Sequence, residues 1–177
     1  IVQGLLHMSP DRDSKVQDVK LADVVERALA IVGPRLERRR VELVLDIPPD
    51  LTAVGHAIQL EQVVLNLLIN ASHALTSRPL GRIEVLARID GDDVVLSVSD
   101  NGLGMDDQVR SHIFDAFYTT RQKGQGTGLG LSVSRTIVEQ HGGTITAISE
   151  PGEGATFVIR LPRLGQQAAL NDEHAPA

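Results

Sequence analysis

The sequence predicts an α+β fold, a two-layer α/β sandwich in which a mixed sheet packs against helices. Its expected elements follow the order helix, strand, helix, strand, strand, loop, helix, strand, strand. This order lacks the regular strand–helix alternation of a doubly wound sheet. Apolar residues make up 42% of the 177 residues, enough for one domain with a hydrophobic core. We therefore expect about five strands packed against three helices.

Three long segments and one short segment have the apolar spacing of helices. In the first, apolar residues recur at helical spacing from Leu21 to Leu36, and Gly33–Pro34 predicts a kink. The longest pattern has an apolar stripe from Leu60 to Leu75 that contains two asparagines. The helices are expected at residues 21–40, 56–76, 107–114 (the short one) and 128–141.

Alternation of apolar and polar residues predicts five strands. Pro48–Pro49 end the first, and the turns at 90–93 and 150–154 each join two strands into a hairpin. The strands are expected at residues 41–47, 82–89, 94–99, 144–149 and 155–161. Residues 115–127 show little periodicity and predict a mobile loop. Three of the four aromatic residues, Phe114, Phe117 and Tyr118, lie at its start, where apolar side chains could dock the loop.

The composition excludes several classes of protein. The 17 Lys and Arg against 23 Asp and Glu give a net charge of −6, which argues against a nucleic-acid-binding surface. The absence of cysteine excludes a disulfide scaffold and a thiolate metal site. No apolar run approaches the roughly 18 residues that a membrane span requires. We expect a soluble, cytoplasmic domain that does not bind nucleic acid.

The first chemical motif is the pair Asn66 and Asn70, one helical turn apart and therefore on one helix face. Asparagine is a mediocre helix former, and its side-chain amide needs hydrogen-bond partners when it is buried. Two asparagines beside an apolar stripe therefore cost stability. A neutral amide oxygen is also a ligand that phosphate-bound magnesium accepts. The alternative is that both are ordinary amides on a helix surface.

The second motif is Asp100-Asn-Gly-Leu-Gly104, directly after an expected strand. A carboxylate at the end of a strand can accept a hydrogen bond from an exocyclic amine. The glycines beyond it let a flat ring approach the backbone. An ordinary turn of Asp, Asn and Gly explains the same residues.

The third motif is the glycine-rich segment from Gly124 to Gly130, which runs into a helix. Successive backbone N–H groups and the positive end of the helix dipole make such a segment a cradle for an anion. The dinucleotide fingerprint would require glycine at Leu131, and the Walker ending GK[ST] is missing. The alternative is a flexible linker, which the apolar periodicity after Gly128 disfavours.

Together these segments resemble the ATP-binding catalytic domain of sensor histidine kinases, part of the gyrase, Hsp90, histidine kinase and MutL superfamily. NLLINASHA (66–74) resembles the N box, DNGLG (100–104) the G1 box, FDAFYTTR (114–121) the F box and lid, and GTGLGLS (126–132) the G2 box. The F box has Ala116 where proline is common. The resemblance covers Asp18 to Pro162 and implies a Bergerat-type fold.

The resemblance also implies roles for individual residues. Asn70 would coordinate Mg²⁺ between the phosphates, with Asn66 beside it, and Asp100 would bind the adenine amino group. Thr156 would support adenine through water. His73 stands where many relatives have a basic residue near the γ-phosphate, and Arg121 and Lys123 would neutralise phosphate from the lid; for His73 and Lys123 a solvated side chain is the alternative. The remaining contacts with ATP or ADP are expected from Gly102, Gly104, Thr127, Gly128, Leu129, Gly130 and Leu131.

Asn66 separates two kinds of activity. In the relatives that hydrolyse ATP, a glutamate four residues before the magnesium-binding asparagine activates water. An amide cannot take a proton at neutral pH, so Asn66 favours transfer of the γ-phosphoryl group to an external histidine. An ATPase switch without phosphotransfer is the alternative, and a degenerate domain that only binds nucleotide is a third possibility.

The resemblance sets the expected domains and partners. Residues 1–17 would be a remnant of the dimerisation-domain helix and linker, 18–163 the catalytic domain, and 164–177 a disordered tail. Because His7 is followed by Met8-Ser9-Pro10 and the sequence starts at Ile1, we expect a fragment that binds ATP without phosphorylating itself. The full protein would be a homodimer, with or without a membrane anchor, that phosphorylates a histidine of its own dimerisation domain and then a response regulator receiver domain.

Overall fold

A computed structural model describes residues 16–76, 78–120 and 127–163 of the chain. Helices α1 (Leu21–Arg38), α2 (Ala57–Ala74) and α4 (Gly130–Gln140) are joined by the short α3 (Asp107–His112). The strands are β1 (Gln17–Lys20), β2 (Glu42–Asp46), β3 (Thr52–Gly55), β4 (Arg82–Asp90), β5 (Asp93–Asp100), β6 (Thr144–Glu150) and β7 (Gly154–Pro162).

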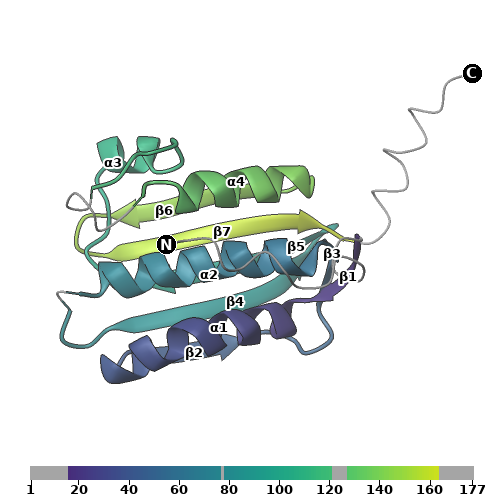
Figure 1. Ribbon diagram of the computed structural model, residues 1–177, viewed down its shortest axis with the longest axis horizontal. Helices are drawn as coiled ribbons and strands as arrows, with labels where there is room; N and C mark the ends of the chain where they lie inside the picture. The colour runs from purple at the N-terminus through teal and green to yellow at the C-terminus, as the bar shows by residue number, and fades with distance from the viewer. Residues whose placement is uncertain (1–15, 77, 121–126, 164–177) are drawn as a thin grey trace, which may run out of the picture.

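The main sheet has five strands in the order β2-β4-β5-β7-β6, and α1, α2 and α4 lie on one of its faces (Figure 1). The edge strand β2 runs parallel to β4, whereas the other neighbours are antiparallel. The short α3 stands beside the N-terminal end of α4 in this view. This mixed sheet with helices confirms the predicted α+β fold class.

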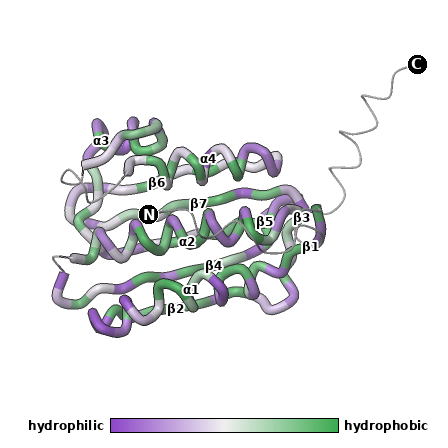
Figure 2. Tube along the Cα trace, viewed as in Figure 1, coloured by the Kyte–Doolittle hydropathy of each residue, from purple (hydrophilic) through white to green (hydrophobic). Residues whose placement is uncertain are grey.

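The core fills the space between this sheet and the three long helices. Side chains alternate along a strand, so Val94, Leu96 and Val98 of β5 point to the helices together with their partners on β7. The central helix α2 buries Leu67 and Leu68 completely. Figure 2 colours long stretches of α2 and of the central strands as hydrophobic. The helix face that stays outside this core is where the asparagines lie.

A second sheet, β1 with β3, was not predicted from the sequence. The two strands are antiparallel, with Gln17 opposite Gly55, and they lie at one end of the main sheet (Figure 1). Each has four residues, and only Val19 and Ala53 in them bury an apolar side chain, too short a pattern for alternation to show. Because Gln17 pairs in this sheet, the folded domain begins at least one residue before the expected Asp18.

Two predicted helix boundaries shift for reasons of backbone geometry. The helix expected from residue 128 begins at Gly130, because Gly128 has φ +68°, a left-handed conformation that a right-handed helix cannot contain. The first helix continues through Pro34 and ends at Arg38. Within the described residues, no helix combines the length and apolar character needed to cross a membrane.

Candidate functional site

Asn66 ties α2 to the start of α4. Its Nδ2 donates to the carbonyl oxygen of Gly130 at 3.0 Å and lies 3.2 Å from Oγ of the buried Ser134. Both contacts use the amide nitrogen, so the side-chain carbonyl oxygen takes part in neither. Asn70 follows one turn later and is half-buried, on nearly the same face of the helix. The structure thus places the two asparagines in one stripe beside the N-terminus of α4.

His73 continues this stripe and is half-buried. The guanidinium group of Arg35, on α1, lies 3.4 Å from Nε2 and 3.3 Å from Nδ1 of the His73 ring. Because each of the two terminal nitrogens of the guanidinium lies near a different ring nitrogen, the guanidinium lies across the imidazole. It places a permanent positive charge next to the ring. Sequence reasoning missed Arg35, because nothing in its local sequence distinguishes it from the arginines at 38–40.

Asp100 ends β5 with a buried carboxyl group that is 9% exposed. Its Oδ1 accepts a hydrogen bond from the backbone N–H of Gly102 at 2.8 Å. Burial raises the pKa of Asp100 from 3.8 to about 6, although the backbone hydrogen bonds from Gly102 and Ala155 act in the opposite direction. The carboxyl group is therefore mostly ionised at pH 7 despite a large loss of hydration.

The glycines after Asp100 are places where a side chain would not fit. A Cβ at Gly102 would lie 2.6 Å from Cβ of Ala74, on the last turn of α2, and 2.7 Å from Oδ1 of Asp100. Gly104 has φ +67°, and a Cβ there would lie 1.9 Å from the carbonyl oxygen of Glu150. The backbone after β5 therefore packs directly against α2 and against the β6–β7 turn.

The N-terminus of α4 carries neither a side-chain cap nor an acidic side chain. Its N-cap residue Leu129 makes no side-chain capping bond, and the first turn holds no acidic residue. Among the described residues, the Leu129 N–H has one long contact, 3.4 Å from Oγ1 of the exposed Thr127. Gly130 opens the helix, and Leu131 packs half-buried against the core. These N–H groups carry the positive end of the helix dipole.

Comparison with known proteins decides the family. The family described as histidine kinase-, DNA gyrase B-, and HSP90-like ATPase matches residues 55–165. The chain belongs to this family. It is 39% identical over 163 residues to the histidine-protein kinase AtoS of Escherichia coli, covering 92% of the chain and 26% of AtoS. It is 41% identical over 169 residues to the sensor histidine kinase ZraS of Klebsiella oxytoca, covering 94% and 36%.

Solved structures agree with this assignment. The mycobacterial sensor histidine kinase MprB superposes with a TM-score of 0.72 at 29% identity, over 84% of this chain and 97% of that one. The chain is thus the ATP-binding catalytic domain of a two-component sensor histidine kinase. It spans about a quarter to a third of the length of AtoS and ZraS.

The structure brings most expected site residues of this histidine kinase domain together around the last turns of α2. Asn66 contacts the start of α4, and Ala74, two turns later, contacts Gly102 beside Asp100. The segment between Asn66 and Ala74 therefore connects the glycine-rich segment with the buried carboxylate.

The register of β5 and β7 separates Thr156 from Asp100. In the β5–β7 pair, Asp100 stands opposite Ala155, and Thr156 stands opposite Ser99. Because side chains alternate, Thr156 lies on the sheet face opposite to Asp100, where its Oγ1 is 2.9 Å from Oγ of Ser99. Ala155 holds the position opposite the carboxylate, and the expected role of Thr156 toward adenine stays a prediction.

The base of the expected lid is only partly described. The N–H of Phe117 donates to the carbonyl oxygen of Gly128 at 2.9 Å, so these two residues lie side by side. Phe117 is 73% exposed, whereas Phe114 packs edge-on against Phe157 with ring centroids 6.4 Å apart. Phe114 is therefore the aromatic anchor in this structure. The expected phosphate contacts Arg121 and Lys123 lie outside the described residues, as does His7.

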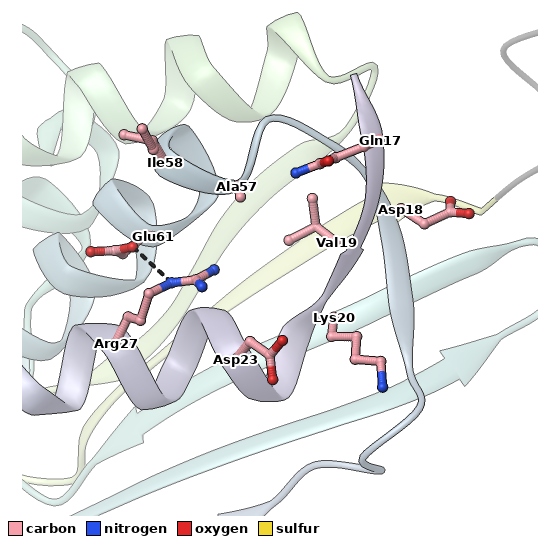
Figure 3. Close-up of a pocket in the computed structure, with 9 residues that line it drawn as sticks. All are labelled: Gln17, Asp18, Val19, Lys20, Asp23, Arg27, Ala57, Ile58 and Glu61. Carbon is pink, nitrogen blue, oxygen red and sulfur yellow. Dashed lines mark hydrogen bonds and ion pairs between the residues drawn. The ribbon is translucent and has the colours of Figure 1, made fainter. Parts of the chain in front are cut away.

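A groove between β1, α1 and the start of α2 is separate from this site (Figure 3). Arg27 and Glu61 form an ion pair across it at 3.1 Å. Ala57 opens α2 at this groove, whereas the asparagine stripe occupies the other half of the helix. Its lining residues are Gln17, Asp18, Val19, Lys20, Asp23, Arg27, Ala57, Ile58 and Glu61.

Proposed function

We propose that this domain positions Mg²⁺-ATP so that its γ-phosphoryl group is transferred to a histidine on the dimerisation domain of the same protein. One observation favours phosphotransfer over hydrolysis of ATP. At the position of a hydrolytic base stands Asn66, whose amide is neutral and whose nitrogen is bonded to Gly130. Such a group positions its neighbours and takes no proton from water.

The adenine end of the proposed site is Asp100 with the glycines that follow. The carboxylate of Asp100 accepts a hydrogen bond from the exocyclic amine of adenine, which distinguishes adenine from guanine at this edge. Gly102 leaves the ring room to approach, because any side chain there would fill the space beside Asp100. A buried carboxylate is costly unless paired, and an amine donor from the ligand supplies that partner.

The phosphate end is the start of α4 together with the asparagine stripe. The first N–H groups of α4 have no side-chain cap and can donate to phosphate oxygens. The amide oxygens of Asn70 and, beside it, Asn66 suit a hard cation, so these residues would hold Mg²⁺. Magnesium, when bound, neutralises charge on the phosphates. His73 with Arg35 adds positive charge to the same side of α2.

In the proposed transfer the histidine nitrogen attacks phosphorus in line with the leaving oxygen. A nitrogen–phosphorus bond forms, the bond to the β-phosphate oxygen breaks, and ADP leaves with the electron pair. The domain contributes orientation and charge stabilisation. The phosphohistidine would then donate its phosphoryl group to a response regulator receiver domain.

Replacement of Asp100 tests the adenine assignment. Asp100→Asn should weaken ATP binding by roughly 1 to 3 kcal/mol, because the amide presents a donor to the adenine amine. Binding is measured by calorimetry on the folded variant. Asp92→Asn, which makes the same charge change in the exposed β4–β5 turn, serves as the control. Equal ATP affinity in wild type and Asp100→Asn would refute the adenine assignment.

A transfer assay separates the kinase from an ATPase switch. The chain is incubated with γ-labelled ATP, Mg²⁺ and the dimerisation domain supplied as a separate protein. We expect label on a histidine of the added domain and little phosphate release without it. Steady phosphate release in the absence of an acceptor would favour the ATPase switch and contradict the kinase proposal.

A further inference from the structure

Arg78 lies in the segment between α2 and β4, and its guanidinium group joins two loops. Nη2 donates to the carbonyl oxygen of Gly102 at 3.0 Å and also to the carbonyl oxygen of Gly152. Gly102 belongs to the loop after β5, and Gly152 belongs to the β6–β7 turn. One nitrogen therefore holds together two backbone segments that are far apart in the chain.

Both peptide segments are also held from the other side. The N–H of Gly102 donates to Oδ1 of Asp100 at 2.8 Å, and the N–H of Gly152 donates to the carbonyl oxygen of Leu103 at 2.6 Å. Gly102 is thus hydrogen-bonded on both sides of its Cα: Arg78 donates to its carbonyl oxygen, and the Asp100 carboxylate accepts from its N–H. Together the two bonds fix the position of the Gly102 backbone.

These two hydrogen bonds control the position of Gly102. Gly102 already lies so close to Ala74 that a Cβ would be 2.6 Å from the Ala74 side chain. Any shift of the Gly102 backbone changes both the space beside Asp100 and the hydrogen bond that Asp100 accepts. Arg78 bonds the carbonyl oxygen of Gly102, and Asp100 bonds the N–H of the same residue.

The guanidinium group of Arg78 does not use all of its hydrogen-bond donors. Its Nε is buried and finds no acceptor among the described residues. No carboxylate of the described chain forms an ion pair with it either. A half-buried cation with an unpaired donor costs stability. A residue that served only to join the two loops would not need a charge or an unpaired N–H.

We propose that Arg78 is a positioning residue of the adenine subsite. By fixing the backbone of Gly102, Arg78 sets the space that is left for adenine beside Asp100 and the orientation of the Asp100 carboxylate that accepts its hydrogen bond. This inference rests on the proposed function, because it assigns Arg78 to the adenine end of that site. Arg78 acts through the backbone of Gly102, without touching the reacting phosphate.

Binding of adenosine and ADP to the full chain tests this role. Arg78→Met keeps most of the length of the side chain and removes the donors, and it should weaken adenosine and ADP by the same factor, about tenfold. Arg78→Lys keeps the charge and should lose less affinity for both ligands than Arg78→Met does. Arg160→Met, at the far end of the sheet, where Arg160 pairs with Asp90 at 2.8 Å, is the control and should bind both ligands as wild type does.

Two readouts separate positioning from a purely structural role. The Gly102 amide resonance should shift in Arg78→Met without nucleotide, and the loss of affinity should persist well below the unfolding temperature. A folded Arg78→Met that binds adenosine within twofold of wild type overturns the inference. Should that variant fail to fold, Arg78→Leu, which also lacks the donors, replaces it, and adenosine affinity within twofold of wild type in that variant overturns the inference equally.

The controls also distinguish failure of this inference from failure of the proposed function. If Asp100→Asn loses affinity while Arg78→Met does not, the adenine site stands and only the role of Arg78 is lost. If wild type binds no ADP, or Asp100→Asn binds it unchanged, the proposed function itself fails.

Discussion

The side-chain nitrogen of Asn66 donates to the carbonyl oxygen of Gly130 at 3.0 Å, so the middle of α2 is bonded to the first residue of α4. The same carbonyl accepts from Oγ of Ser134 at 2.9 Å. Two side chains therefore fix the first turn of α4, whose N–H groups are the proposed phosphate donors. Asn66 would therefore act on the proposed phosphate site through the backbone of α4 as well as through its own oxygen.

Asn66→Asp should break this arrangement. The carboxylate would face the Gly130 carbonyl in place of a donor and would repel phosphate, so we expect a loss of about 1 to 3 kcal/mol in stability and weaker ATP binding. Urea unfolding and calorimetry measure the two effects. Gln62→Glu, an equal charge change at an exposed position of α2, should alter neither much. An Asn66→Asp variant with wild-type midpoint and affinity would show that the bond to Gly130 is unimportant.

The pKa of Asp100 makes stability depend on pH. Burial raises this pKa from 3.8 to about 6, so between these values the folded chain holds a proton that the unfolded chain has released. Stability therefore falls as pH rises through this range, by roughly 3 kcal/mol in all for this group, and stays lower above it. Asp100→Asn should remove this contribution and gain stability near pH 7 while it loses ATP affinity.

The difference between wild type and Asp100→Asn isolates this effect from the other carboxylates. Unfolding free energies are measured in urea from pH 4 to pH 8 for both proteins. Their difference should grow between pH 4 and pH 6 and then level off. A difference that is constant over the whole range would rule out a raised pKa at Asp100.

Gly104 and Gly91 form a matched pair for backbone strain and close packing. Both have positive φ, +67° and +62°, but only at Gly104 would an added methyl group lie 1.9 Å from a carbonyl oxygen, that of Glu150. Alanine at Gly91 should cost about 1 kcal/mol, whereas alanine at Gly104 should cost several times more and abolish nucleotide binding. Thermal unfolding of both variants checks this. Similar melting temperatures would mean that the loop after β5 can move away freely.

His141 holds the start of α2 to the end of α4. Its ring is 3% exposed; Nε2 accepts from the N–H of His56 at 3.0 Å, and Nδ1 lies 2.7 Å from the carbonyl oxygen of Ile137. Since a backbone N–H can only donate, the ring proton belongs on Nδ1. His141→Phe would leave the His56 N–H unpaired and should cost about 1 to 3 kcal/mol, with ATP affinity unchanged.

The matched control for that variant is His112→Phe, because His112 is exposed on α3 and its contacts with Asp115 and the Tyr118 ring are local. Its stability should stay within about 0.5 kcal/mol of wild type. Both variants are compared by urea unfolding. Loss of ATP affinity in folded His141→Phe would show that this end of α2 also controls the nucleotide site.

The large elements could be predicted because each carries a long apolar pattern. The stripe from Leu60 to Leu75 marks α2, and the alternation in β4 and β5 marks a hairpin. The β1–β3 pair has no such pattern, since four residues hold at most two inward positions. The left-handed backbone at Gly128, which delays α4, is a property of the folded loop that glycine permits without requiring.

Candidate site residues could be proposed from the sequence where one motif carries its own chemistry, as at Asn66, Asn70 and Asp100. Arg35 and Arg78 could not, because their partners, His73 and the Gly102 carbonyl, reach them only through the packing of α1 on α2 and of two loops on each other. The two-residue period along β7 puts Ala155 and not Thr156 on the face of Asp100, a distinction that requires knowledge of the strand register.

Asp100 lies where two hairpins, β4–β5 and β6–β7, pair with each other through β5 and β7. In the chain, α3 and α4 lie between these two hairpins. Each hairpin can form from local contacts, but pairing β5 with β7 closes a long loop and is entropically the expensive step of folding. The backbone bond from Ala155 to the Asp100 carboxylate exists only after that step. A nascent chain that has been synthesised as far as Asp100 thus contains the recognition carboxylate without the strand that completes its surroundings.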